Sequence, residues 1–372
     1  MNKQYKLTQL SVVYHPGETL GEKLKEMGMS IKEFAIRTTK PEKTIIAVIK
    51  GTSSITTEMA VSFENVTKVP ARVWLNMQRM YDEYMVRVKR EKDAALSAEW
   101  MRKFPISEMV NRGWLVQCAT VDQKVNALYN YFGISSEKAW NDYYINQELK
   151  VAFRISLAHT KDPYAISAWL RQGELQAMTI NLDTPFSEKK LRNTISVMKQ
   201  IMAEAADDFY TKLQKVCASI GIKLINTQCL PKAPINGATR WINDTPVIQL
   251  SNRYKRYDIF WFTFFHEIGH ILLHGKKAIF LEESVSTELE KDKEAEADAF
   301  AANVLLTKNE EQEFISAKDY SPKSVMDAAT KYSTHPSVIV GRLQHLKLIK
   351  YWQNQSLMKK VDDLIQIYFT RF

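Results

Sequence analysis

The segment DIFWFTFFHEIGHILLHG, residues 258–275, constrains this chain more than any other. His266 and His270 are four residues apart, so a helix places them on one face, with Glu267 beside the first of them. Two imidazoles at this spacing can bind one Zn²⁺ ion, and the neighbouring carboxylate can activate a water molecule. The surrounding residues predict a buried helix that is too short to cross a bilayer. Histidines buried there need a partner, either a metal ion or the backbone carbonyls of an ordinary core.

A catalytic zinc site usually has a third protein ligand, and residues 290–306 offer candidates. The sequence EKDKEAEADAFAANVLL is rich in alanine and favours a helix. Glu294 and Asp298 share a face with the small or apolar residues Ala301 and Leu305, and that face should pack inward. We therefore predict Glu294 as the third ligand, with Asp298 orienting one of the histidines through a hydrogen bond.

Several alternatives to Glu294 stay open. Glu296 is on the same predicted helix but points about 200° away. Glu282 and Glu283 lie in a predicted loop, which makes them weaker candidates. Glu294 could also belong to a solvated run of charges together with residues 291–293.

The pair of motifs HEIGHILLHG and EAEADAFAANVLL resembles the ImmA/IrrE family of bacterial and phage metallopeptidases, in which a HExxH helix precedes an ExxxN-x-x-A helix. The resemblance implies that His266 and His270 bind zinc, that Glu267 is the catalytic base and that Glu294 is the glutamate ligand. Asp298 stands where the family usually has Asn, in an ExxxD pattern that is also similar to thermolysin-like zinc enzymes.

Four other histidines are weaker candidates. His274 extends the histidine face by one turn at a spacing unlike that of the metzincins, so we expect it to support the site or the fold. His335 and His345 lie within THPSVIVGRLQHL, which resembles the terminal element of the family, and could stabilise an oxyanion, although a structural role is the simpler interpretation. His159 stands alone and is expected to be structural.

Composition limits the class of protein. A chain of 372 residues is long enough for two or three domains. Met1 is followed by polar residues, which predicts no signal peptide, and the dispersed Cys118, Cys217 and Cys229 fit free thiols in a reducing cytoplasm. The net charge of +9 is compatible with a nucleic-acid partner.

The first quarter of the chain, residues 1–92, carries most of the excess charge, with 16 Lys and Arg against 10 Asp and Glu. It reads as a run of short helices. Ser30 is predicted to cap the second helix in a capping box with Glu33, and Pro41 to open the third. These two helices, joined by residues 38–40, have the layout of a helix-turn-helix.

Two phrases here, HPGETLGEKLKEMGMSIKEFA and ITTEMAVSFENVTKVPARVWLNMQRMYDEY, resemble the HigA-like branch of the Xre helix-turn-helix family. The resemblance implies that the third helix enters the major groove through Glu42, Lys43, Ile46, Ala47 and Lys50. Ile46 and Ala47 can offer only apolar contact to a thymine methyl group, and Glu42 would meet phosphates unfavourably. Positive side chains that could neutralise phosphates are Lys32, Lys40, Lys43 and Lys50. A domain that dimerises or binds a protein partner is the alternative.

The remaining segments contain no further candidate catalytic residues and are expected to form supporting structure. Residues 93–190 read as amphipathic helices without chemistry and resemble the connector of longer Xre–ImmA/IrrE fusions. A helix from Glu188 to Ala218 should follow. Three strands come next, at Ile222–Ile225, Ala238–Ile242 and Pro246–Leu250, with a turn at Asn243-Asp244 between the last two. The edge of such a sheet could hold an extended peptide.

We thus expect a mainly α protein with a small antiparallel sheet, of class α+β. The expected domains are a helix-turn-helix domain (1–92), a helical connector (93–190), a zincin-like metallopeptidase domain (191–350) and a helical tail (351–372). The expected function is that of a cytoplasmic, Zn²⁺-dependent regulatory endopeptidase acting on a repressor or antitoxin. It could also bind double-stranded DNA and form a homodimer, and no membrane partner is expected. The alternative is a DNA-binding repressor or antitoxin whose zinc site is structural or sensory.

Overall fold

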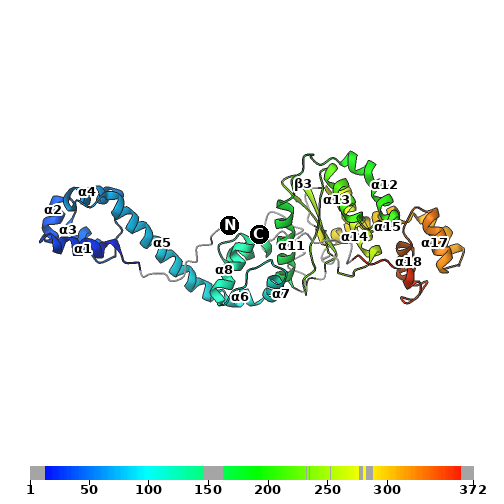
Figure 1. Ribbon diagram of the computed structural model, residues 1–372, viewed down its shortest axis with the longest axis horizontal. Helices are drawn as coiled ribbons and strands as arrows, with labels where there is room; N and C mark the ends of the chain where they lie inside the picture. Colours follow the sequence, from blue (N-terminus) through cyan, green and yellow to red (C-terminus); the bar gives the residue numbers. More distant parts are fainter. Residues whose placement is uncertain are drawn as a thin grey trace. The chain divides into compact units, whose positions relative to one another are not determined.

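The computed structural model describes residues 13–145, 162–231, 233, 235–251, 253–275, 280–281 and 288–361. Contacts within the chain divide it into two compact units, Met1–Ser97 and Ala98–Phe372 (Figure 1). In the part of the chain described, no helix has both the length and the apolar character needed to cross a membrane.

The first unit is a bundle of helices: α1 (Pro16–Glu26), α2 (Ile31–Arg37), α3 (Glu42–Ile49), α4 (Thr57–Thr67) and α5 (Ala71–Leu96). Phe34, Phe63 and Trp74 pack together at its centre, and all three are fully buried. Ser30 caps α2 as predicted, because its side chain accepts a hydrogen bond of 3.1 Å from the backbone N–H of Glu33. The predicted capping box is only half made, since the Glu33 carboxylate pairs with Arg37 instead.

The second unit begins with the helices α6 (Ala98–Arg102), α7 (Ile106–Asn111), α8 (Val121–Phe132) and α9 (Glu137–Trp140), then the π-helical turn η1 (Asn141–Ile145) and α11 (Pro163–Met178). Buried aromatic rings hold these helices together. The ring of Trp140 stacks on Tyr164 at the start of α11, with 4.8 Å between the centroids, and packs edge-on against Phe104. This segment is helical, as the sequence predicts.

Helix α11 is tied to the central sheet by side chains that reach its backbone. The Trp169 indole donates to the carbonyl of Thr227, and Gln249 donates to the carbonyl of Trp169 at 2.8 Å. The Arg240 guanidinium, almost fully buried, donates to the carbonyl of Leu170 at 2.6 Å. These hydrogen bonds join α11 to the sheet through polar groups that are buried together.

The sheet consists of β1 (Lys223–Asn226), β2 (Gly237–Ile242), β3 (Thr245–Leu250) and β4 (Phe280–Leu281), in the order β1-β3-β2-β4. Asn243 and Asp244, both at positive φ, form the predicted turn between β2 and β3. The α+β class is confirmed, but the sheet is mixed, because β1 pairs with β3 in the parallel sense. Along the chain β2 precedes β3, but in the sheet β3 lies between β1 and β2. The β2–β3 hairpin therefore places β3 alongside β1.

The single helix predicted from Glu188 to Ala218 is wrong. The structure has two helices, α12 (Glu188–Glu204) and α13 (Phe209–Ser219). Ala205 adopts a left-handed conformation with φ 48° and ends α12, and Asp208 stands at the start of α13. The break lets both helices bury apolar side chains, such as Met202 and Phe209, in the same core.

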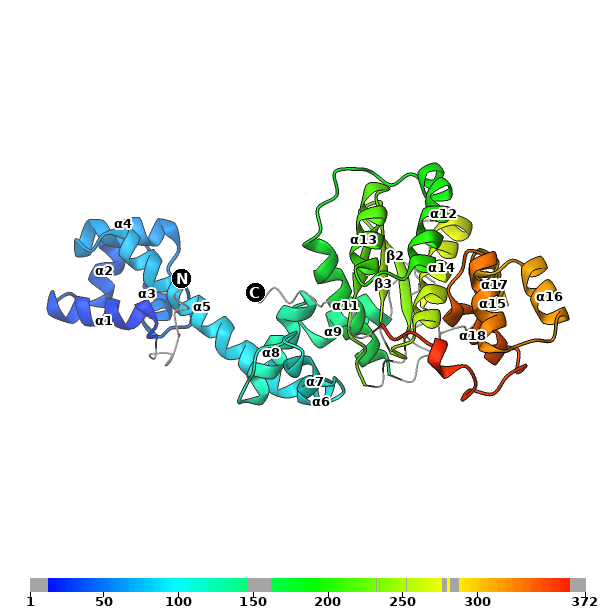
Figure 2. The same cartoon turned by 45° about the vertical axis from the view of Figure 1, so that its right-hand side comes forward.

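Helix α14 (Tyr257–His274) is the central element of this core and contacts β2, β3 and the next helix, α15 (Glu288–Leu305) (Figure 2). The chain continues through α16 (Lys308–Ser316), α17 (Pro322–Lys331) and α18 (Pro336–His345) to the 3₁₀ turn η3 (Gln355–Leu357). Helix α18 also packs against α14. The HExxH segment therefore lies in a helix that is enclosed on several sides.

Candidate metal centre

Helix α14 is buried along most of its length, as its apolar sequence predicts. Phe264, Phe265 and Ile268 are fully buried in the core. A side chain at Gly269 would come within 3.2 Å of the Cα atom of Ala297, so small residues let α14 and α15 approach closely there. This close approach brings carboxylates of α15 to the histidines of α14.

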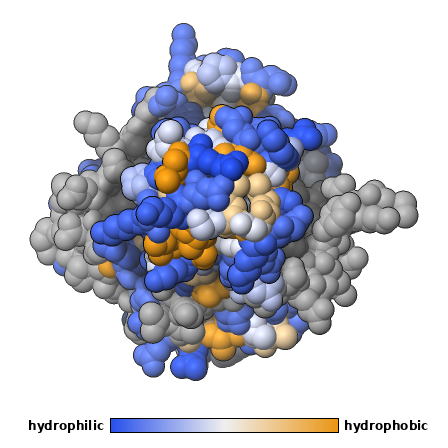
Figure 3. All heavy atoms as spheres, turned by 90° about the vertical axis from the view of Figure 1, so that its left-hand side faces the viewer, coloured by the Kyte–Doolittle hydropathy of each residue, from blue (hydrophilic) through white to orange (hydrophobic). Residues whose placement is uncertain are grey.

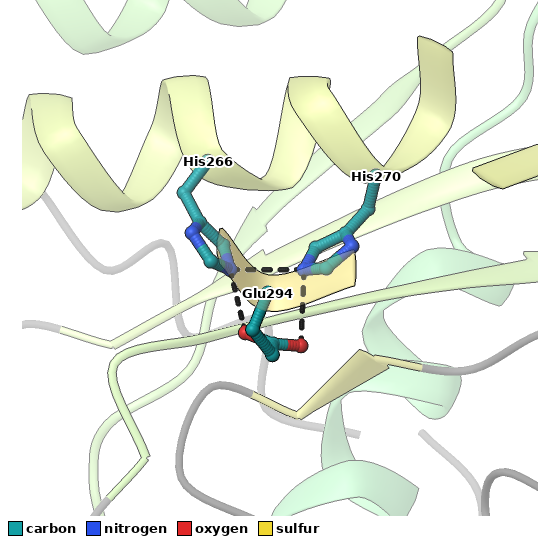
Figure 4. Close-up of side chains that lie close together, drawn as sticks. All are labelled: His266, His270 and Glu294. Atoms are coloured by element: carbon teal, nitrogen blue, oxygen red, sulfur yellow. Dashed lines mark hydrogen bonds and ion pairs between the residues drawn. The ribbon is translucent and has the colours of Figure 1, made fainter. Parts of the chain in front are cut away.

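Three of the predicted site residues meet at one point, where two imidazoles and a carboxylate face one another (Figure 4). The Nε2 atoms of His266 and His270 are 2.9 Å apart. The Glu294 carboxylate lies 3.2 Å from His266 Nε2 through one oxygen and 3.4 Å from His270 Nε2 through the other. Both histidine side chains are 1% exposed and that of Glu294 is 18% exposed. The group can hold a metal ion and is shielded from solvent on the histidine side.

Burial and the neighbouring charged groups together determine the pKa values of His266, His270 and Glu294. Burial lowers the pKa of His266, but hydrogen bonds to Asp298 and Glu294 outweigh it and raise the pKa to about 10. Burial lowers the pKa of His270 to about 4, despite its contact with Glu294. Burial would raise the pKa of Glu294, yet the two histidines outweigh this effect and hold it at about 2. In the absence of a cation, His266 thus carries the proton and Glu294 the negative charge.

The Glu267 carboxylate lies next to the start of β2. Its side chain is fully buried, and its backbone carbonyl accepts a hydrogen bond of 3.3 Å from Thr239. Gly237, the first residue of β2, leaves the space that the carboxylate occupies, because a Cβ atom there would lie 2.5 Å from Glu267 Oε1. Sequence reasoning did not single out Gly237, although a glycine in a strand often marks a close approach.

Two side chains, Asp298 and His274, contact the Nδ1 atoms of the metal-site histidines. Asp298 Oδ1 lies 2.8 Å from His266 Nδ1, the contact that its position on α15 predicts. His274 Nδ1 lies 3.0 Å from His270 Nδ1, and the other nitrogen of His274 lies 3.0 Å from Glu296. Glu296, considered from the sequence as a rival ligand, thus contacts His274 instead of joining the group. Glu282, Glu283 and His159 lie outside the described residues.

The two histidines considered for oxyanion stabilisation, His335 and His345, do not belong to the metal-binding group. His335 caps α18, since its Nδ1 accepts from the backbone N–H of Ser337 at 3.1 Å, and its ring packs against Tyr257. His345 is exposed in the last turn of α18. Neither belongs to the group of His266, His270 and Glu294. The capping contact explains His335 as a structural residue.

The residues predicted to contact DNA lie on the first unit. Lys32, Lys43 and Lys50 are exposed, whereas Ile46 and Ala47 are half-buried on α3. Lys40 forms an ion pair with Glu58, and Glu42 is exposed in the first turn of α3. The side of the molecule seen in Figure 3 is largely hydrophilic, with separate apolar patches. Exposed apolar residues of this unit include Ile36 on α2 and Val61 on α4.

Comparison with solved structures finds similarity to the N-terminal region of the chain. Solved structures similar to the N-terminal region include an addiction module antidote protein of a HigA family from Coxiella burnetii, 31% identical. Another is a protein from Nostoc punctiforme described as an antidote protein of a plasmid maintenance system, 27% identical. Each match covers 22% of this chain and 90% of the other, with a TM-score of 0.22.

No curated protein matches the sequence. The profile of the Peptidase M78 family, the IrrE N-terminal-like domain, matches residues 218–343, which include both histidines and Glu294. This part of the chain is thus similar to the Peptidase M78 family, which supports a metallopeptidase.

Proposed function

We propose that this protein is a zinc-dependent endopeptidase that cleaves a regulatory protein, a transcriptional repressor or an antitoxin. The observation that carries the proposal is the convergence of His266, His270 and Glu294 in one buried group, with the Glu267 carboxylate on the same helix. Two histidines and one glutamate are the ligand set of several zinc peptidases, which keep a fourth position open for water.

The donor set and its spacing fit zinc. Imidazole nitrogens favour zinc and other transition metals over magnesium or calcium. Ligand atoms about 2.0–2.1 Å from a tetrahedral ion lie about 3.3 Å from one another. The carboxylate oxygens stand 3.2 Å and 3.4 Å from the two nitrogens, close to that value. When bound, zinc supplies Lewis acidity that polarises a water molecule and the scissile carbonyl.

Glu267 is the residue we assign as general base. It directly follows His266 on α14, and its side chain is fully shielded from bulk water. A carboxylate held there can take the proton of the attacking water and pass it to the departing amine nitrogen. Asp298, which contacts His266 Nδ1, would keep that ligand in place during these proton transfers.

The first unit supports a regulatory role, through binding to DNA. Helices α2 and α3 are joined by a short turn, and Lys43 on α3 and Lys50 just after it are exposed to solvent. We propose that this unit binds double-stranded DNA, chiefly through phosphates, because Lys43 and Lys50 are exposed cations whereas Ile46 and Ala47 offer bases only apolar contact. Binding to DNA would bring the peptidase to proteins that act at the same site. The location is proposed to be the cytoplasm.

The Glu267→Gln variant tests the proposed function. The wild-type chain and the variant are each co-expressed with the products of neighbouring genes, and a shortened polypeptide is sought by mass spectrometry. We expect cleavage only with the wild type, while zinc content stays near one per chain in both, because Glu267 is not a ligand. Glu313→Gln, an exposed substitution on α16, is the matched control and should cleave normally. Loss of zinc from the Glu267 variant would contradict the assigned role.

A repressor whose metal site is structural or sensory is the second candidate, favoured by the exposed Lys43 and Lys50 in and after α3. The same variant separates the two functions in cells. A pure repressor would keep its full regulatory effect with Gln at position 267, whereas a peptidase would lose it.

A further inference from the structure

A relay of three side chains stands behind His270. His270 Nδ1 lies 3.0 Å from His274 Nδ1, and His274 Nε2 lies 3.0 Å from Glu296 Oε2. The His274 side chain is 3% exposed, whereas that of Glu296 is 62% exposed. The relay therefore runs from the buried metal centre to the surface of α15.

The contacts show that His274 is not a fourth ligand. Both of its ring nitrogens already face other groups, one toward His270 and one toward Glu296. The His270 nitrogen that it meets is Nδ1, whereas the group of His266, His270 and Glu294 is assembled around the Nε2 atoms. His274 is thus placed to orient His270, not to bind the ion.

Binding of a cation at His270 Nε2 determines every proton in the relay. The lone pair of Nε2 is then used for the cation, so the ring carries its proton on Nδ1 and donates it to His274 Nδ1. His274 must in turn carry its proton on Nε2, which donates to the Glu296 carboxylate. Each hydrogen bond of the relay then has one donor and one acceptor.

We infer that His274 and Glu296 are positioning residues that fix the tautomer and ring orientation of His270 for zinc. His266 is oriented by a single carboxylate, Asp298, so the two histidines of the motif are supported in different ways. The inference rests on the zinc site proposed above. It gives Glu296 a role in metal binding, although its side chain lies outside the ligand group.

Zinc affinity of the full-length protein, measured by competition with a chromophoric chelator, tests the relay without any substrate. Removal of a residue that supports a ligand typically weakens metal binding about 10- to 100-fold. We expect a loss of this size in His274→Ala and a smaller loss in Glu296→Gln. Asp292→Asn is the control, since it removes the same charge from an exposed position of α15 and should bind zinc like the wild type.

The double variant distinguishes a relay from independent effects. If Glu296 acts through His274, then Glu296→Gln should cause no further loss in the His274→Ala background. Additive losses, or unchanged affinity in Glu296→Gln, would overturn the inference. His274→Gln serves where His274→Ala fails to fold. Failure of the wild type to bind one zinc would instead contradict the proposed function, so the two failures are distinguishable.

Discussion

Substitution of Gly237 by alanine should separate catalysis from metal binding. The new Cβ atom would lie 2.5 Å from Glu267 Oε1 and 2.6 Å from Thr263 Cγ2, both shorter than any ordinary contact. The carboxylate is the end of a flexible side chain, so it can withdraw by on the order of 1 Å to restore a normal distance. The three atoms nearest to the new Cβ atom belong to Glu267 and Thr263, and none belongs to a ligand side chain.

A displacement of about 1 Å in a reacting group can lower the rate about 100-fold. We therefore expect Gly237→Ala to reduce cleavage about 100-fold while zinc affinity changes by less than about threefold. Cleavage is followed on the polypeptide identified by co-expression, and zinc affinity by chelator competition. The double variant Gly237→Ala with Thr263→Ser removes the second clash and leaves the first, so it should remain as inactive as the single variant.

Two results would refute the reasoning. Equal losses of cleavage and zinc affinity would mean that the substitution distorts the whole site. Full activity in Gly237→Ala would mean that the position of the Glu267 carboxylate is unimportant, and the assignment of Glu267 as base would fail with it.

Four further predictions concern pH, DNA and stability. Since the pKa of His266 is about 10 and that of His270 about 4, zinc binding should displace one proton, from His266. The affinity for zinc should therefore rise about tenfold per pH unit between about pH 5 and 10. An affinity that does not change with pH would contradict this. In the metal-free protein the same raised pKa contributes stability that is complete below about pH 6.5 and lost as the pH rises through about 10. Lys43→Ala and Lys50→Ala should each weaken binding to DNA of any sequence and lower the salt slope by about one; equal binding by both variants and wild type would favour a protein partner for this unit. Thr56→Ala removes the side-chain cap of α4 and should destabilise the first unit by about 1 kcal/mol, as measured by amide hydrogen exchange; unchanged protection would show that the cap is dispensable.

The ligand group could be predicted from the sequence because it depends on helical spacing. His266 and His270 share a face at any position of α14, and Glu294 and Asp298 share a face of α15 that also carries the buried Ala301. Spacing of this kind is a local property of the chain, and the packing of the two helices then needs only to bring the faces together.

Other features depend on packing between elements and could not be predicted. The contact of Glu296 with His274 requires the particular crossing of α14 and α15 at Gly269. The break at Ala205 occurs in a residue that normally favours helix, because burial of α12 and α13 in one core outweighs that preference. The parallel pairing of β1 with β3 likewise depends on the path of the connecting chain.

The hydrogen bonds between α11 and the sheet determine where the chain can be cut. A fragment that begins at Leu191 would remove the carbonyls of Trp169 and Leu170, the acceptors for Gln249 and Arg240. The two side chains would lose these acceptors and the helix that covers them, which is strongly destabilising for a buried cation. The smallest piece that can fold as a peptidase should therefore begin before Asp162, which caps α11. Exchange of one DNA-binding unit for another, in evolution or by design, would have to join the chain upstream of this point.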